Sequence, residues 1–228
     1  MDTENSISAG SDLQQAIKDT AWQQIAQHGA AALSLRAIAR QLGITAPAIY
    51  NYFHRRDDLV TVLIKDAYLS FGDSQQAAIR NLPAEDYHLQ LITLGLAYRE
   101  WAVAFPERYQ LIFGTPIAGY HAPLAEILPA AARSLSVLVG VLAAAGEAGR
   151  LSQQNPVPLT PALQSMLKAG RELYQVREEA LYQAIAVWSR VHGLVSLEIG
   201  HQFPEFISDA GEIFRREVQI ICSQALEE

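Results

Sequence analysis

Residues 34–59 read SLRAIARQLGITAPAIYNYFHRRDDL, and this stretch decides the fold of the N-terminal part of the chain. Ser34 can accept a hydrogen bond from an unpaired amide at a helix start, and apolar residues then recur at i, i+3, i+4 and i+7. Gly43 ends this helix because glycine takes the left-handed conformation without steric cost. Thr45 can cap a second helix, with Pro47 in its first turn. The pattern predicts a helix-turn-helix.

The second helix of this motif has a buried side and an exposed side. Ile49 and Phe53 are predicted to pack inward, because they are apolar and four residues apart. The residues predicted to point outward are Thr45, Ala46, Ala48, Tyr50, Asn51 and Tyr52. Such a face suits the major groove of DNA.

The charge of the chain is acidic overall but basic around this motif. The chain has 17 Lys+Arg against 24 Asp+Glu, a formal net charge of −7, which argues against a sequence-independent coat for nucleic acid. Between Asp19 and Asp57 there is no acidic residue, whereas four arginines lie there: Arg36, Arg40, Arg55 and Arg56. This distribution predicts a local phosphate-facing surface, with specificity supplied by contacts to base edges.

Length and composition indicate a two-part helical protein of the cytoplasm. The 228 residues suffice for one large or two small domains, and half of them are apolar. The single cysteine, Cys222, excludes an internal disulfide and fits a reducing compartment. No uninterrupted apolar run reaches the ~18 residues of a membrane span. Residues 1–11 lack the features of a signal peptide and are predicted to be a disordered arm.

The rest of the chain is also expected to be helical, since no alternating strand pattern occurs. Prolines at 156, 158 and 161 mark a loop over residues 149–161. The predicted helices cover 57 to about 71, 83–105, 107–113, 122–128, 129–145, 161–173, 176–202 and 205–226.

Residues 13–68 resemble the DNA-binding domain of the TetR family of bacterial transcriptional regulators. The resemblance rests on LRAIA (35–39), LGI (42–44), AIYNYF (48–53) and RDDL (56–59). The sequence departs from the family pattern in two places. Arg56 replaces the usual lysine, and its planar guanidinium favours bidentate phosphate contact. Ala46 and Pro47 stand where the family often has small polar residues, which weakens the transfer of base-contact roles to them.

The resemblance implies that the protein binds double-stranded operator DNA. By position, Thr45 would contact a phosphate or a base edge, while Tyr50, Tyr52 and Arg56 would contact phosphates. Tyr52 could equally pack against the protein, and Thr45 could act only as a helix cap. The full set of predicted DNA-binding residues is Ser34, Leu35, Arg36, Thr45, Ala46, Pro47, Tyr50, Asn51, Tyr52, His54 and Arg56.

The second half of the chain is similar to the WHG-type C-terminal domain of one branch of this family. The similarity rests on WSRVHG (188–193) and YREWAVAFPERYQLIFG (98–114). It implies a helical domain that binds a small molecule and dimerises through its last two helices. Aromatic residues at three- and four-residue spacings could line an apolar cavity, although each could equally be core. The predicted pocket residues are Tyr98, Trp101, Phe105, Tyr109, Phe113, Trp188 and His192.

Dimerisation also has a physical motive. A single helix-turn-helix reads few base pairs, whereas two of them about 34–36 Å apart read successive major grooves of a palindrome. Two helices from each subunit can form a four-helix interface by two-fold symmetry. The predicted interface residues are Val191, Leu194, Val195, Ile199, Ile213, Phe214, Val218 and Ile221.

The sequence therefore predicts an all-α protein with three parts: a disordered arm (1–11), a three-helix helix-turn-helix DNA-binding domain (12–58) and a helical-bundle effector-binding and dimerisation domain (59–228). Its predicted function is ligand-responsive transcriptional regulation, with repression a family-based expectation and activation left open. The predicted partners are operator DNA, a small apolar effector and a second copy of the chain. No membrane partner, metal or cofactor is predicted.

Two other classes of protein were weighed. An enzyme lacks support, because no nucleophile elbow, phosphate loop or metal-ligand spacing occurs. A helical interaction or architectural protein that binds DNA loosely remains open. The two classes differ in sequence preference. A regulator prefers its site to random DNA by roughly 10³ or more, whereas a loose binder does not.

Overall fold

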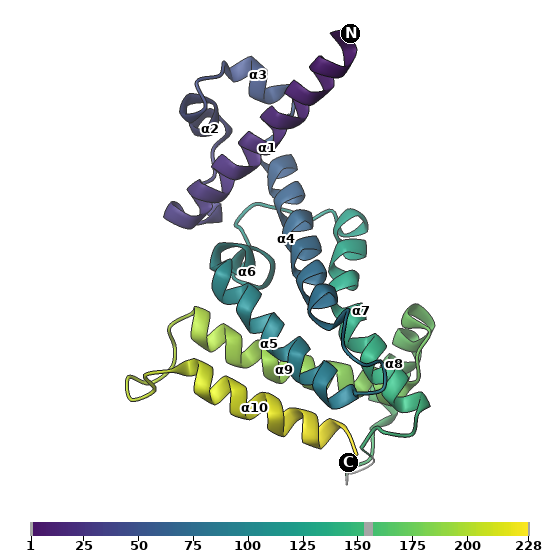
Figure 1. The fold of residues 1–228 in the computed structure, drawn as a ribbon. Helices are drawn as coiled ribbons and strands as arrows, with labels where there is room; N and C mark the ends of the chain where they lie inside the picture. The colour runs from purple at the N-terminus through teal and green to yellow at the C-terminus, as the bar shows by residue number, and fades with distance from the viewer. Residues whose placement is uncertain (1, 153–156, 228) are drawn as a thin grey trace. The chain divides into compact units, whose positions relative to one another are not determined.

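The computed structural model describes residues 2–152 and 157–227, and the described residues are predominantly α-helical (Figure 1). The chain divides into two compact units. The first, here called the head, comprises Met1–Tyr68 and Phe105–Ala131. The second, here called the bundle, comprises Leu69–Ala104 and Ala132–Glu228. The all-α prediction is confirmed.

The head contains the helix-turn-helix and the elements packed on it. These are α1 (Asp2–His28), the 3₁₀ turn η1 (Ala30–Ala32), α2 (Leu35–Gln41), α3 (Ala46–Tyr50), the first half of α4 (Arg56–Ile79), α6 (Pro106–Phe113) and the start of α7 (Leu124–Glu147). Ile17, Ile38, Ile49 and Leu63, from α1 to α4, have no exposed surface. Their burial fixes the sides of α2 and α3 that remain exposed.

Residues 2–11 of the predicted disordered arm are part of α1, and Met1 lies outside the described residues. The helix begins at Asp2, not near residue 12, and runs to His28. The segment contains no proline, which permits this extension. The predicted boundary after residue 58, within α4, remains a prediction.

The bundle is built on α5 (Tyr87–Ala104), the remainder of α4 and α7, α8 (Pro161–Tyr174), α9 (Glu178–Ile199) and α10 (Ala210–Ala225). Helices α9 and α10 lie side by side, and both contact α5 (Figure 1). At Gly95 of α5, an added Cβ would come within 3.0 Å of Val218, so glycine allows α10 to approach closely. An antiparallel bridge between Leu151 and Leu226 ties the chain end to the loop after α7.

Helix α7 corrects the prediction of two separate helices, over 122–128 and 129–145. It is continuous and contains Pro129. Proline removes one helical hydrogen bond, but Ile127 and Ala130 on either side are buried and hold the helix by packing. By length and composition α7 could cross a membrane, and a buried core helix meets the same criterion. Leu138, Val141 and Leu142 are buried, as in a core helix.

Candidate DNA-binding surface and effector site

Helix α3 presents a small exposed surface above a buried residue. The Thr45 side chain caps the helix, accepting a hydrogen bond from the Ala48 amide at 3.4 Å. Ile49 is fully buried, whereas Tyr50 is 37% exposed. Thr45, Ala46, Pro47 and Asn51 are also exposed. A helix anchored on one side and presenting hydroxyl and amide groups on the other can enter a major groove.

Helix α2 adds basic groups to this surface. Ser34 caps it, its Oγ accepting from the Ala37 amide at 3.4 Å. Arg36 and Arg40 are exposed, as is His54 after α3. Arg55 is exposed but paired with Asp58 at 3.0 Å. Arg36, Arg40 and His54 can therefore supply phosphate contacts, whereas Arg55 would first have to leave its ion pair with Asp58.

Three predicted DNA-binding residues have structural roles in the head. Leu35 is only 5% exposed, and its side chain belongs to the core of the head. Tyr52 is half-buried and packs against the same core. Arg56 is half-buried and donates a hydrogen bond from Nη2 to the Ala30 carbonyl at 3.1 Å. Sequence spacing did not reveal this last bond, because η1 is 26 residues away in the chain.

In the bundle, the structure brings together an aromatic and hydrogen-bonded cluster around His192. The Tyr98 hydroxyl lies 2.9 Å from His192 Nδ1, and the Trp188 ring stacks on the imidazole with centroids 5.2 Å apart. Phe71 meets Tyr98 edge-on at 4.8 Å and contacts Trp101 at 4.9 Å. These five residues, here called the aromatic cluster, come from α4, α5 and α9.

The polar groups of the aromatic cluster are uncharged near neutral pH. Burial lowers the pKa of His192 below its ordinary value, which favours the neutral imidazole. Its Nε2 lies 3.4 Å from Ser196 Oγ. Trp101 Nε1 donates to Ser70 Oγ at 3.0 Å. Phe71, Ser70 and Ser196 were not predicted as site residues. The i+4 spacing of Ser196 from His192 was the available signal for one of them.

The other three predicted pocket residues belong to the head. Tyr109 is buried, and its ring lies 5.2 Å from that of Phe113. Phe113 in turn meets Tyr68 edge-on at 5.9 Å. The Phe105 ring lies next to the Arg108 guanidinium. The predicted set thus divides between the two units, with Tyr98, Trp101, Trp188 and His192 in the bundle.

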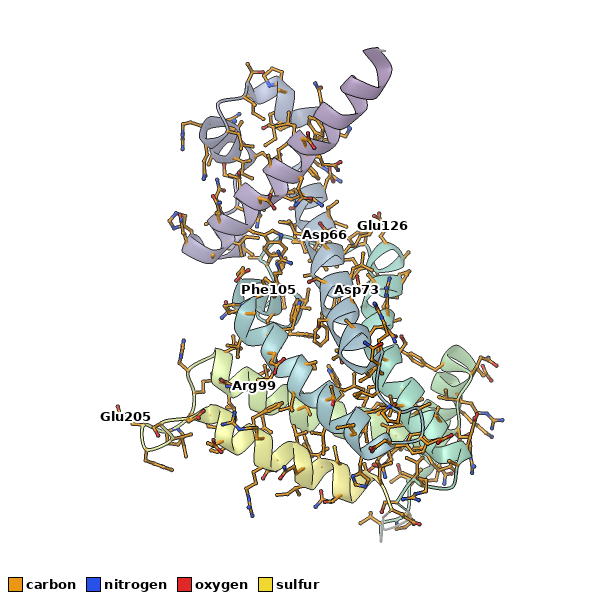
Figure 2. All side chains as sticks on the ribbon, viewed as in Figure 1. Asp66, Asp73, Arg99, Phe105, Glu126 and Glu205 are labelled. Atoms are coloured by element: carbon orange, nitrogen blue, oxygen red, sulfur yellow. The ribbon has the colours of Figure 1, made fainter. Side chains whose placement is uncertain are left out.

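An ion pair also joins two helices of the bundle, α5 and α9. Arg99 of α5, labelled in Figure 2, donates two hydrogen bonds to the Glu198 carboxylate of α9, at 2.7 and 2.6 Å. Its hydrogen bonds to Glu198 raise the pKa of Arg99. Because the two charges satisfy each other, the pair fixes α5 against α9.

The residues predicted to form the dimer interface lie mostly inside the chain's own core. Five of the eight residues are buried inside a single chain: Val191, Val195, Phe214, Val218 and Ile221. Leu194, Ile199 and Ile213 are half-buried. The apolar periodicity identified the inward faces of α9 and α10, because those faces pack on α5 and on each other. No group of three or more potential metal ligands occurs among the described residues.

The fold and the exposed α3 surface define a helix-turn-helix transcriptional regulator with an all-α second unit. Residues 17–63 match the sequence model described as "Bacterial regulatory proteins, tetR family". Residues 91–221 match the one described as "Tetracyclin repressor-like, C-terminal domain". The second match includes both motifs, at 98–114 and 188–193, on which the resemblance of the C-terminal half rests.

Similar proteins support the same assignment. The HTH-type transcriptional regulator Rv1816 of Mycobacterium tuberculosis is 32% identical over 202 residues, 88% of this chain and 86% of that protein. The crystal structure of the regulatory protein SCO4313 has 39% identity and a TM-score of 0.77, covering 92% of this chain and 95% of that one. A tetR-family protein from Rhodococcus RHA1 shares the fold at 17% identity, with a TM-score of 0.64 and coverage of 94% and 98%. The chain belongs to the TetR family of transcriptional regulators, which are not enzymes.

Proposed function

We propose that this regulator binds a palindromic operator as a homodimer, represses transcription there, and is released by a small uncharged effector. The observation that supports DNA binding is that α3 has one buried side and one exposed side. Ile49 is fixed in the core while Thr45, Tyr50 and Asn51 are exposed beside Arg36 and Arg40. Membership of a DNA-binding family supports the same proposal, and a cytoplasmic location follows from this role.

Operator recognition is tested by selection from a pool of random-sequence DNA duplexes at about 150 mM salt, since phosphate contacts make affinity depend on salt. Enrichment of one palindrome is the expected result. Retention without enrichment, by folded protein, would favour loose, sequence-independent binding and contradict the proposal. Placing the enriched palindrome in a promoter before a reporter gene then distinguishes repression from activation.

For the dimer we propose the outward face of α9 and α10 in place of the inward one. On α9, Tyr182, Ser189 and Leu197 lie on the side opposite the buried residues, and an added Cβ at Gly193 would meet nothing within 4 Å. On α10, half-buried Ile213 and Ile220 share one face. Arg190 of α9 bonds Glu217 and Gln224 of α10, holding the two helices together. A partly apolar face formed by two neighbouring antiparallel helices suits a two-fold four-helix interface.

The aromatic cluster is the proposed effector site. Trp188, His192 and Ser196 are half-buried, while Tyr98, Phe71 and Trp101 behind them are buried. Aromatic walls with a few uncharged polar groups favour a neutral, largely apolar molecule. Such a molecule would replace the hydrogen bond between Tyr98 and His192, or would accept a hydrogen bond from one of these two side chains. The effector can change operator affinity only if it binds the DNA-binding conformation and the released conformation with different affinities. The typical coupling free energy is about 1–3 kcal/mol.

A thermal-shift screen of neutral and charged aromatic compounds tests this site. Neutral compounds are expected to raise the unfolding temperature of the wild-type protein and to release operator DNA. The same compounds are expected to have a smaller effect on Tyr98→Phe, which retains the ring but loses the hydroxyl. Equal stabilisation of Tyr98→Phe and wild type by every active compound would place the effector elsewhere.

A further inference from the structure

The apolar core of the head is completed by a segment far from the DNA-binding motif in sequence. Ile127 of α7 is buried in the same cluster as Ile38 and Ile49. Ile117 and Tyr120, in the connection between α6 and α7, pack against that cluster. The four N-terminal helices therefore share their core with residues 105–131.

Hydrogen bonds attach this segment to α4. The Tyr120 hydroxyl lies 2.9 Å from Thr61 Oγ1. The Thr61 hydroxyl also donates to the Asp57 carbonyl, at 2.9 Å, in the first turn of α4. Two turns further along, the Tyr68 hydroxyl donates to the Ile112 carbonyl of α6 at 3.3 Å. These contacts hold the segment along the first three turns of α4.

Arg108 attaches α6 to α1. Its guanidinium carbon lies 5.2 Å from the centroid of the Trp22 ring and 4.6 Å from that of Phe105. Phe105 lies where α5 ends and α6 begins (Figure 2). A planar cation between two aromatic rings is attracted to both faces. The Glu107 carboxylate, at 4.0 Å from Arg108 Nε, adds a weak ion pair.

Trp22 is followed directly by two residues that bond α2. Gln23 Oε1 accepts from the Gln41 side chain at 3.0 Å. Gln24 Oε1 accepts from the Ser34 amide, at the cap of α2, at 3.4 Å. Gln23 and Gln24 therefore attach both ends of α2 to α1 next to Trp22, and α2 packs directly on α3.

We propose that Arg108 is a positioning residue for operator recognition. It holds Trp22, and through Trp22 the register of α1 against α2 and α3, without touching DNA. This inference rests on the proposed operator binding. It adds that a residue outside the helix-turn-helix, at the start of α6, controls how well the recognition surface fits its specific site.

The test compares the enriched palindrome with a scrambled duplex, by fluorescence anisotropy over a range of salt concentrations, using the full-length protein. Arg108→Met keeps the length of the side chain and removes its charge. It is expected to weaken palindrome binding about tenfold, to change scrambled-duplex binding less than about twofold, and to keep the wild-type salt slope, because no phosphate contact is lost. Arg177→Met, an exposed arginine before α9, is the matched control and is expected to behave as wild type.

Two milder variants keep the test decisive if Arg108→Met folds poorly. Trp22→Phe, made alone, keeps a smaller ring beside Arg108 and is expected to weaken palindrome binding less than Arg108→Met does, with little change on the scrambled duplex. Tyr120→Phe removes only the hydroxyl that meets Thr61 and is expected to weaken palindrome binding about threefold, at the scale of one hydrogen bond.

Three results would overturn the inference. Palindrome binding within twofold of wild type in Arg108→Met would remove the positioning role. An equal loss on both duplexes with a salt slope smaller by about one would make Arg108 a phosphate contact instead. Loss that only follows the folded fraction, with Tyr120→Phe unchanged, would leave a purely structural role. If wild-type protein shows no preference for any palindrome, the proposed function fails, and this inference fails with it.

Discussion

The head and the bundle use the same kinds of residue in opposite ways. In the head, Tyr50 and Asn51 are exposed on a short helix held by one buried isoleucine. In the bundle, Tyr98 and Trp101 are buried and bonded to groups on other helices. The residues that make the exposed surface are marked by the caps Ser34 and Thr45 and by the apolar spacing within α2 and α3. The effector site depends on packing between α4, α5 and α9. Local spacing can therefore identify the first, whereas only the folded chain assembles the second.

Truncation of a core aromatic of the bundle is expected to have the largest effect. Phe214 is 1% exposed and packs beneath Arg99. Phe214→Ala is expected to reduce the free energy of unfolding by about 3–5 kcal/mol, because it deletes buried surface and leaves a cavity. Phe206→Ala, at a position 82% exposed, is the matched control and should change it by less than about 0.5 kcal/mol. Chemical denaturation measures both. Similar effects would contradict the inward assignment of Phe214.

An exposed aromatic of the head is expected to affect DNA binding and not folding. Tyr50→Ala should weaken operator binding about tenfold or more, equivalent to ~1.4 kcal/mol, with the unfolding temperature nearly unchanged. Leu89→Ala, similarly exposed at 40% at the start of α5, should change neither. Operator titration with thermal unfolding checks this. Unchanged operator affinity in folded Tyr50→Ala would remove Tyr50 from the DNA-binding surface.

The outward face of the bundle can be separated from its inward face by charge insertion. Leu197 is 38% exposed on α9. Leu197→Glu is expected to raise the dimer dissociation constant about tenfold or more, since a carboxylate would be buried at the interface. Met166→Glu, at an exposed apolar residue of α8, is the control. Sedimentation at micromolar concentration measures both, and an undisturbed dimer in folded Leu197→Glu would refute the proposed face.

The smallest effect concerns pH and distinguishes the bundle from the head. Because burial lowers the pKa of His192 in the folded protein, the unfolded chain binds a proton more readily. The stability that this group contributes is fully present above about pH 6.5, its unfolded pKa, and declines as pH falls below that value. His192→Phe should therefore show a smaller decrease in unfolding temperature between pH 7.5 and 5.5. Equal decreases in wild type and His192→Phe would contradict this.

Much of the head could be predicted from sequence because its signals are local. The caps Ser34 and Thr45, and the buried Ile49, follow from residue type and spacing alone. Leu35 shows the limit of that reasoning. It lies at the start of α2, where family position implies DNA contact, yet its side chain points into the core.

The errors in the bundle have a different cause. Apolar stripes on α9 and α10 identify a buried side, but not whether the same chain or a second copy covers it. Val195 and Phe214 are covered by their own chain. Likewise, regular aromatic spacing could not show that Tyr109 belongs to a different unit from Tyr98. At Pro129, tertiary packing prevails over a local helix-breaking tendency.

The shared core of the head also bears on how such regulators can be recombined. Ile127 and Tyr120 contribute to the packing beneath the helix-turn-helix, although they lie more than sixty residues after its end. A chimera made by a single crossover after α4 would combine the helix-turn-helix of one protein with the core residues at 105–131 of another. Retargeting this regulator to a new promoter by domain exchange therefore calls for two transplanted segments, the N-terminal helices and residues 105–131, moved together.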